Sequence, residues 1–266
     1  MNCLRLGSEN LRLVTCVFIL PTKNQLSIDI IIRFPITYII LEQGTNRHGK
    51  IIKSFLYRHH WPREPSVVGL WMCHNCSYLD VLTDKYAFSG DRFLAYEYIP
   101  RTNERNLVGV CVANRVYPWA VDELEEWAHC TCARPERNRM YFIAHCLRSP
   151  NLFKKYDVQY LYDVEVLATS SEVAAQGVGT LLLQRVLNYA QELRIPLVHV
   201  IAISHYTARM CEKCGMKLEW SMDYSEFIDD AGQRVFFPRR PHHKVSIYAM
   251  YFDPKKGLPE PCLPPY

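Results

Sequence analysis

The chain has 266 residues, of which 49% are hydrophobic and 22% are charged. This composition excludes collagen-like, low-complexity and wholly disordered chains, and the length is enough for one large domain. The net charge of +4 comes from 31 basic and 27 acidic residues, which form no lysine- and arginine-rich stripe. We therefore expect no nucleic-acid partner.

Cysteine content and hydropathy bear on the cellular compartment. Eleven cysteines are too few for a disulfide scaffold, and their odd number leaves at least one thiol unpaired. The most apolar segment, Leu26–Leu41, is interrupted by Asp29, Arg33 and Pro35, so it does not reach the ~18–20 apolar residues of a membrane span. The first residues make a poor signal peptide because Glu9 lies in the n-region. We expect a cytoplasmic protein that does not bind a membrane.

The two ends of the chain differ from its middle. Residues 1–34 show no helical or strand period, so we expect an N-terminal extension there. Residues 253–266 contain five prolines, which cannot continue a helix or a sheet, so we expect a C-terminal tail. The 35–252 segment is expected to form a single, monomeric domain.

Apolar periodicity predicts the elements of this domain in chain order. The predicted strands are Ile36–Leu41, Arg92–Tyr98, Leu107–Val116, Val158–Leu167, Pro196–Ala202, Met216–Met222 and Val245–Phe252. The predicted helices are one around Ile51–Leu56 that ends before Pro62, and Ser77–Phe88, Asp122–Cys130, Arg137–Leu147, Thr180–Leu193 and Ser204–Cys214. Strands and helices alternate in the second half, which predicts an α/β fold around one central sheet.

A glycine-containing turn, Gln176–Thr180, lies between a predicted strand and a long predicted helix. Backbone N–H groups at a helix N-terminus bind phosphate when side chains do not block the approach. The turn lacks the third glycine and the later acidic residue of the dinucleotide fingerprint, and it has no Gly-Lys-Ser/Thr. An ordinary tight turn is the alternative interpretation.

Longer stretches around this turn resemble a known family. Ala174–Leu182 resembles the acetyl-coenzyme A loop of the GNAT acetyltransferase superfamily, and Ser204–Met216 resembles its second helix, which ends in Glu-Lys-x-Gly. The combination is similar to insect arylalkylamine N-acetyltransferases. Phe55–Tyr57 followed by Arg63-Glu64-Pro65 resembles the segment that carries the catalytic glutamate of that family. The resemblance implies the GNAT fold, a central mixed twisted β-sheet flanked by helices in a single domain.

The resemblance also implies a function. It is direct transfer of acetyl from acetyl-coenzyme A, as co-substrate, to a small primary arylalkylamine such as dopamine, serotonin or tyramine. Glu64 would be the general base, and Ser204 and Thr207 would handle protons. The residues implied to bind the pantetheine arm are Leu167, Ala168 and Thr169, and those implied to bind the pyrophosphate are Gln176, Gly177, Val178, Gly179 and Thr180.

Three positions depart from the family pattern. Ala174 stands where an arginine or glutamine opens the loop, Cys211 where many members have a tyrosine acting as general acid, and Ile203 where the insect enzymes have a serine. Two alternatives therefore stay open, the same enzyme acting on a polyamine or another amine and a catalytically silent acyl-coenzyme A binder. An aliphatic diamine site would need extra carboxylates, whereas an arylalkylamine site would need a ring-stacking pocket.

Several candidate residues have a simpler structural interpretation. Glu64 is alternatively a solvated loop carboxylate, with His59 or His60 as the base instead, and Ser204 is alternatively the N-cap of its helix. Thr207 is alternatively a residue that bonds only to its own helix backbone. The cysteine pairs Cys73/Cys76, Cys130/Cys132 and Cys211/Cys214 have a spacing that zinc sites use, but we expect buried free thiols and no metal.

Overall fold

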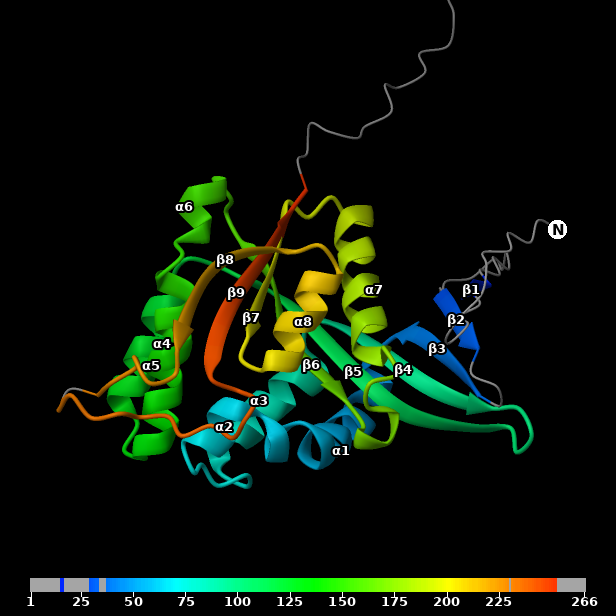
Figure 1. The fold of residues 1–266 in the computed structure, drawn as a ribbon, viewed down its shortest axis with the longest axis horizontal. Coiled ribbons are helices and arrows are strands. Elements are labelled where there is room, and N and C mark those ends of the chain that lie inside the picture. The colour runs from blue at the N-terminus through cyan, green and yellow to red at the C-terminus, as the bar shows by residue number, and fades with distance from the viewer. Residues whose placement is uncertain (1–14, 17–28, 34–36, 230, 253–266) are drawn as a thin grey trace, which may run out of the picture.

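The computed structural model describes residues 15–16, 29–33, 37–229 and 231–252. These residues form one mixed sheet of nine strands in the order β1-β2-β3-β4-β5-β6-β7-β9-β8 (Figure 1). Neighbouring strands are antiparallel except β6 and β7, which are parallel. The strands are β1 Thr15–Cys16, β2 Asp29–Arg33, β3 Tyr38–Gln43, β4 Asp91–Ile99, β5 Glu104–Val116, β6 Leu161–Thr169, β7 Leu197–Ala202, β8 Lys217–Asp223 and β9 Lys244–Tyr251.

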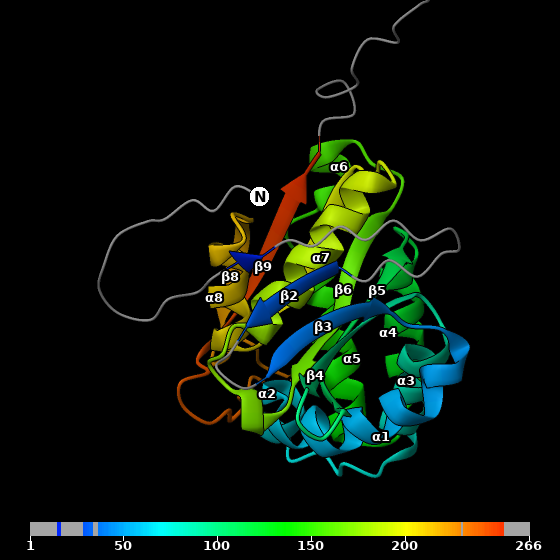
Figure 2. The ribbon, with the colours of Figure 1, turned by 90° about the vertical axis from the view of Figure 1, so that its right-hand side faces the viewer.

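Helices cover both faces of the sheet. Figure 2 shows α7 and α8 on one face and α1, α3, α4 and α5 on the other. None of the described helices has the length and hydropathy needed to cross a membrane. The α-helices are α1 Gly49–His59, α2 Pro65–Gly69, α3 Ser77–Phe88, α4 Ala120–Cys130, α5 Arg134–Arg148, α6 Leu152–Tyr156, α7 Val178–Glu192 and α8 His205–Lys213. Three short 3-10 helices are η1 Asn46–His48, η2 Trp61–Arg63 and η3 Ser171–Val173.

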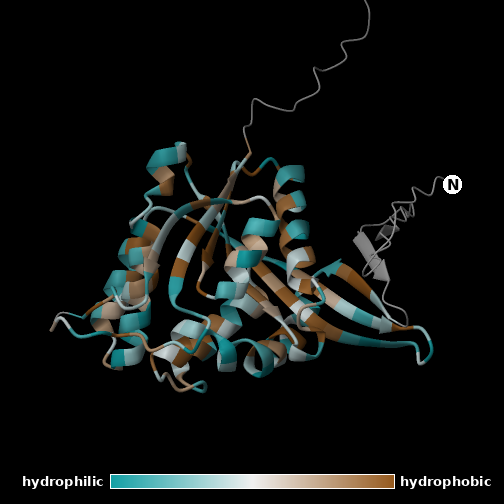
Figure 3. Ribbon diagram, viewed as in Figure 1, coloured by the Kyte–Doolittle hydropathy of each residue, from teal (hydrophilic) through white to brown (hydrophobic). Residues whose placement is uncertain are grey.

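Two apolar cores, one on each face, hold the layers together. On the α7 face, Leu182, Val186 and Ala190 recur every four residues and pack on strand residues such as Val164. The larger core on the opposite face includes buried residues of α3 and α5. Figure 3 shows the apolar residues concentrated along the strands between the helix layers. The sheet is therefore buried on both faces in its centre, as an α/β fold requires.

The predicted elements of the domain are confirmed with small shifts at their ends. The helix predicted over Ser77–Phe88 has those bounds, and Gly215 ends α8 with a φ of +76°. The sequence analysis missed α2 and α6, because helices of five residues are too short to show a helical period. The single-domain mixed sheet flanked by helices is confirmed.

The N-terminal residues require a correction. No strand was expected within residues 1–34, yet β2 pairs with β3 in antiparallel register and β1 pairs with β2. The apolar run within β2 does not alternate, so it gave no strand period, but hydrogen bonding to a strand edge depends on the backbone alone. The separation of residues 1–34 as an extension stays a prediction, and the expected tail at 253–266 lies outside the described residues.

Two irregularities of β6 shape the site. β6 pairs with β7 only at Tyr162 with Val198 and at Asp163 with His199, and the strands form no further pairs toward their C-terminal ends. On its other side, β6 has a bulge, because the register with β5 shifts between Val112 and Ala113 and leaves Glu165 as the extra residue. The sheet is thus open on one side of β6 and bent on the other.

Candidate active site

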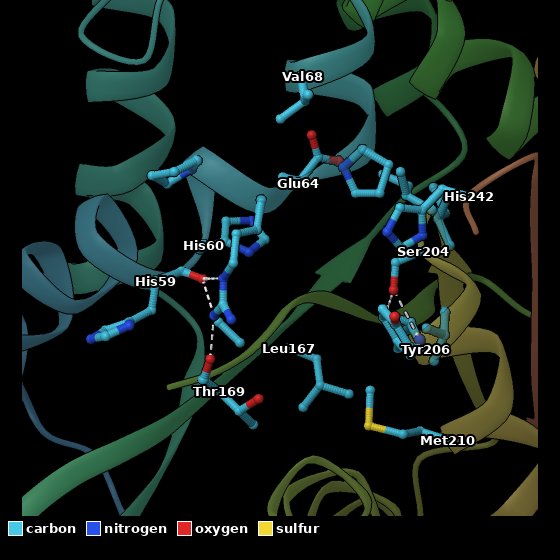
Figure 4. Close-up of a pocket in the computed structure, with 18 of the residues that line it drawn as sticks. His59, His60, Glu64, Val68, Leu167, Thr169, Ser204, Tyr206, Met210 and His242 are labelled. Atoms are coloured by element: carbon cyan, nitrogen blue, oxygen red, sulfur yellow. Dashed lines mark hydrogen bonds between the residues drawn. The ribbon is translucent and has the colours of Figure 1, made fainter. Parts of the chain in front are cut away.

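A cleft of about 410 Å³ lies where β6 and β7 separate (Figure 4). His60, Glu64 and Val68 lie on one wall, and Ser204, Tyr206, Met210 and His242 on the opposite wall, as Figure 4 shows. Leu167 and Thr169 of β6 lie between the two walls. The cleft therefore passes from the α2 side of the sheet to the α8 side.

Glu64 is buried at the N-terminus of α2, with 6% of its surface exposed. Its carboxylate accepts hydrogen bonds from the Ser66 hydroxyl, at 2.8 and 2.9 Å, and from the Val67 N–H at 2.6 Å. Because Glu64 directly precedes Pro65, its backbone is extended, with φ −70° and ψ 120°. Glu64 is therefore a fixed N-cap that lines the cleft, and its interpretation as a solvated loop carboxylate is wrong.

A buried arginine lies behind this carboxylate. Arg139 of α5 is 6% exposed and donates from Nε to Ser66 Oγ at 3.1 Å and from Nη1 to the Tyr78 hydroxyl at 2.9 Å. Its guanidinium also lies 5.8 Å from the centre of the Trp61 ring. Within the described part of the chain, no carboxylate lies within ion-pair distance of Arg139. Its charge is stabilised by these hydrogen bonds, by aromatic faces and by the nearby charge of Glu64, to which Ser66 connects it.

The histidines of the cleft are neutral at pH 7. Burial lowers the pKa of His60 to about 4, against an opposing effect of Glu64. Burial and the charges of Arg63 and Arg58 lower the pKa of His59. The pKa of His242 is lowered by burial and by the neighbouring His205, whose backbone N–H donates to His242 Nδ1 at 3.1 Å. His60 is consequently a weak base.

Two hydroxyls meet at the start of α8. Ser204 Oγ accepts from the Thr207 N–H at 3.0 Å and lies 2.9 Å from Thr207 Oγ1. The N-cap interpretation of Ser204 is therefore confirmed. Both side chains also line the cleft, so capping does not remove them from the site. Ile203, in the position where a serine was expected, contributes an apolar wall to the same cleft.

The β6 backbone presents hydrogen-bonding groups to the cleft. The Ser170 N–H donates to the Val108 carbonyl at 2.8 Å, and Ala168 is paired with Val110 of the same strand. Because backbone groups alternate along an antiparallel pair, those of Leu167 and Thr169 face the opposite side, toward β7. The Thr169 carbonyl accepts there from the Arg63 guanidinium. Ala168 lines the cleft with its side chain and directs its amide to β5.

The glycine turn forms the N-terminus of α7. Gly177 is the N-cap residue with a φ of +83°, and a Cβ at this position would meet no described atom within 4 Å. The N–H groups of Val178, Gly179 and Thr180 belong to the first turn, where helical partners are absent. Gly179 also has a packing role, since a Cβ there would lie 2.4 Å from Met210 Sδ. Gly177 leaves the turn open, and Gly179 allows α7 to approach α8.

Sequence reasoning missed Arg139, Arg63, Tyr206 and His242 as cleft residues. For Arg139 a signal was available, because it shares a helical face with the apolar Phe142 and Cys146 of α5, both of which are buried. Arg63 lies on the short helix η2 and His242 on an irregular segment, and neither carries a period, whereas Tyr206 lies on the predicted helix α8 but was not singled out as a site residue. Cys211, in the position of the expected general acid, is buried outside the cleft, and burial raises the pKa of its thiol.

The cysteines are free in the described part of the chain. The expectation that the paired ones are buried is wrong for Cys73, Cys130 and Cys132, which are exposed. No three histidine, cysteine, aspartate or glutamate side chains gather among the described residues in a way that would hold a metal ion.

Comparisons with known proteins concern the fold. No protein-family model matches the chain. A mosquito arylalkylamine N-acetyltransferase-like 5b structure superposes with a TM-score of 0.72 at 18% identity, covering 80% of this chain and 100% of that one. A Drosophila melanogaster polyamine N-acetyltransferase gives 0.70 at 20% identity, with 80% and 100% covered. Arylalkylamine N-acetyltransferase 2 from Aedes aegypti gives 0.69 at 16% identity, with 81% and 99% covered.

The chain has the GNAT fold. The resemblance inferred from the sequence is confirmed at this level, although sequence identity to each of these structures is 20% or lower. In this GNAT fold the open side of β6 and the buried Glu64 border one cleft, whereas the glycine turn does not line it and lies beside the cleft residue Met210 through Gly179. The two glycines of the turn have separate effects in the structure. Gly177 adopts a positive φ, and Gly179 allows α7 to pack closely on Met210.

Proposed function

We propose that the protein is an acetyltransferase that uses acetyl-coenzyme A as co-substrate and transfers acetyl directly to a small primary amine. The observation that carries this proposal is the opening between β6 and β7, which leaves the backbone groups of Leu167 and the Thr169 N–H without a strand partner beside the cleft. A chain with amide groups, such as a pantetheine arm, finds donors and acceptors there. The first turn of α7, with the N–H groups of Val178, Gly179 and Thr180, supports pyrophosphate binding beside it, and Gln176 and Gly177 precede this turn.

The chemistry begins with a proton on the amine. An alkylammonium titrates near the value of lysine, so it must lose one proton before its nitrogen attacks the thioester carbon. Glu64 takes that proton, directly or through water, because it is a carboxylate held in one orientation at the cleft wall. The carbonyl oxygen becomes negative during the attack, and the Leu167 N–H is the oxyanion donor on the open side of β6.

A second proton completes the balance. As the C–N bond forms and the C–S bond breaks, the nitrogen gives up another proton and the coenzyme thiolate takes one up. The hydroxyl pair of Ser204 and Thr207 lines the cleft and is the proposed relay for this step. Cys211 takes no part because it is buried outside the cleft.

The acceptor class is proposed as an arylalkylamine, with a polyamine as the alternative. The names of the superposed structures include both classes, for those proteins. The choice depends on the lining of the space next to the cleft.

An assay of free-thiol release with acetyl-coenzyme A and a panel of primary amines tests the function. We expect amine-dependent turnover in the parent and a loss of about 10²–10⁴-fold in Glu64→Gln, the usual worth of a positioned base. Ser66→Ala is the matched control, because it removes a hydrogen bond to Glu64 and keeps the carboxylate. Its loss should be far smaller. Absence of turnover with every amine, with coenzyme binding retained, would favour the silent binder.

A further inference from the structure

A second cavity of about 690 Å³ adjoins the cleft. It lies among α3, α4, α5 and the open ends of β6 and β7. Val164 and Glu165 of β6 and Arg139 of α5 line both spaces, as do Ile201 and Ile203. A molecule reacting in the cleft therefore has room to extend into this cavity.

Glu165 stands at the junction of the two spaces. It is the extra residue of the β6 bulge, and bulges redirect side chains. Its side chain is 11% exposed and accepts hydrogen bonds from Lys85 Nζ at 2.5 Å and from Asn114 Nδ2. A buried carboxylate of this kind needs a cationic partner, and Lys85 supplies one.

The partner, Lys85, is the more exposed half of the pair. It lies in the last turn of α3, and its side chain is 46% exposed. Its ammonium lies 6.0 Å from the centre of the Tyr86 ring as well as beside Glu165. The protein thus contains an ammonium position built from a carboxylate, an amide and an aromatic face, filled by a side chain that can move into water.

We propose that this position binds the second cationic group of a diamine acceptor, which displaces the Lys85 ammonium from Glu165. The proposal rests on the proposed acetyltransferase function, and it favours the alternative acceptor class, a polyamine, over the arylalkylamine. Because one ammonium replaces another, Glu165 has a cationic partner both before and after the diamine binds, and no uncompensated buried charge is left. Lys85, whose side chain is 46% exposed, regains hydration when it leaves Glu165.

The spacing along β6 supports a short diamine. Glu165 is two residues before Leu167, the proposed oxyanion donor, and two strand residues span about 7 Å. A chain of a few methylene groups covers that distance. The cavity also contains Asp163, and Glu123 and Glu126 of α4, against the cations Lys85 and Arg139, so its lining carries more negative than positive charges.

The test uses two opposite changes of one ion pair, Glu165→Gln and Lys85→Met, with putrescine and butylamine as acceptors. Butylamine is the matched ligand because it lacks only the second amine. For putrescine we expect KM to rise about 10-fold or more in Glu165→Gln, by the worth of a charge-assisted hydrogen bond. KM should fall a few-fold in Lys85→Met, because the internal competitor is removed. Butylamine should show neither change.

The sign separates the proposal from a structural role. If the pair only stabilises the fold, both variants change KM for putrescine in the same direction, or change KM for butylamine as much as KM for putrescine. Either result would show that the proposal is wrong. Calorimetric titration of putrescine into the parent and both variants gives the same comparison without turnover. If the parent acetylates butylamine well but the two variants do not change KM for putrescine in opposite directions, the proposed function stands and the diamine site is wrong. Melting temperatures check that both variants are folded.

Discussion

At the scale of single residues, neighbouring positions in the chain have very different environments. His60 and Glu64 lie on either side of η2 and both line the cleft, yet Glu64 is tied into α2 by hydrogen bonds. His60 is desolvated, and its pKa is lowered to about 4. The sequence shows only that a histidine and a glutamate are close together, and their different roles depend on what packs over them.

The lowered pKa of His60 predicts a pH dependence of stability. Between pH 6.5 and about 4 the unfolded chain binds a proton at this histidine and the folded chain does not, so the free energy of unfolding falls as the pH is lowered. From pH 7 to pH 5 the loss should be about 2 kcal/mol. Urea unfolding at both values should show a smaller loss in His60→Gln.

The exposed His129 provides the control for this measurement, because His129→Gln should leave the pH dependence of the parent unchanged. Equal pH dependence in the parent and His60→Gln would contradict the assigned desolvation.

At the scale of elements, the glycine turn shows how one motif can serve two purposes. The positive φ of Gly177 starts α7 with an open first turn, while Gly179 lets α7 pack on Met210 of α8. The sequence predicted the helix and the glycine turn before it, but it placed the helix start at Thr180, two residues after Val178, where α7 begins. It did not predict the role of Gly179, because the contact is with a residue 31 positions away that only the folded chain brings near.

Gly177→Glu should abolish coenzyme binding if the turn holds the pyrophosphate, through bulk and like-charge repulsion. Gly215→Glu is the matched control, since Gly215 also has a positive φ and no described atom within 4 Å of a Cβ. Both changes carry a similar backbone strain of about 1–2 kcal/mol. Calorimetry with acetyl-coenzyme A should show loss of binding only in Gly177→Glu. Equal affinities in the two variants would remove the phosphate assignment.

The sequence predicted the domain elements better than the site. Long periodic segments such as α3 and α7 were identified because burial of one helix face requires the pattern. Glu64, Ser204 and the turn were located through the family resemblance. Glu165 was missed because the bulge that turns it toward α3 depends on the register of β6 with β5, and no local pattern records that register.

At the scale of the whole molecule, both apolar cores are formed by residues between Ile39 and Ala249 among the described side chains. β1 and β2 extend the sheet beyond β3, away from the cleft (Figure 1). They therefore lie at a sheet edge that is distant from the cleft.

Deletion of residues 2–34 should consequently lower the melting temperature by only a few degrees, since about 1 kcal/mol corresponds to about 2–4 °C at this size. The deletion also exposes the edge of β3, so light scattering should show more self-association. Calorimetry that finds a fall of about 15 °C or more, or an insoluble product, would show that the N-terminal strands contribute to the fold itself.

The two residue pairs between β6 and β7 have a mechanical consequence. Among the described strands, they are the only pairs that join the β1–β6 half-sheet to the β7–β9 half-sheet. One pair consists of the buried residues Asp163 and His199, whose side chains also meet, with 2.8 Å between Asp163 Oδ1 and His199 Nδ1. Beyond these pairs, toward the C-terminal ends of β6 and β7, the two half-sheets are connected through helices rather than through strand pairing. A ligand whose amides pair with the open edge of β6 would add hydrogen bonds between the two half-sheets, where strand pairing is sparsest. Occupancy of the cleft and rigidity of the whole sheet are therefore thermodynamically linked.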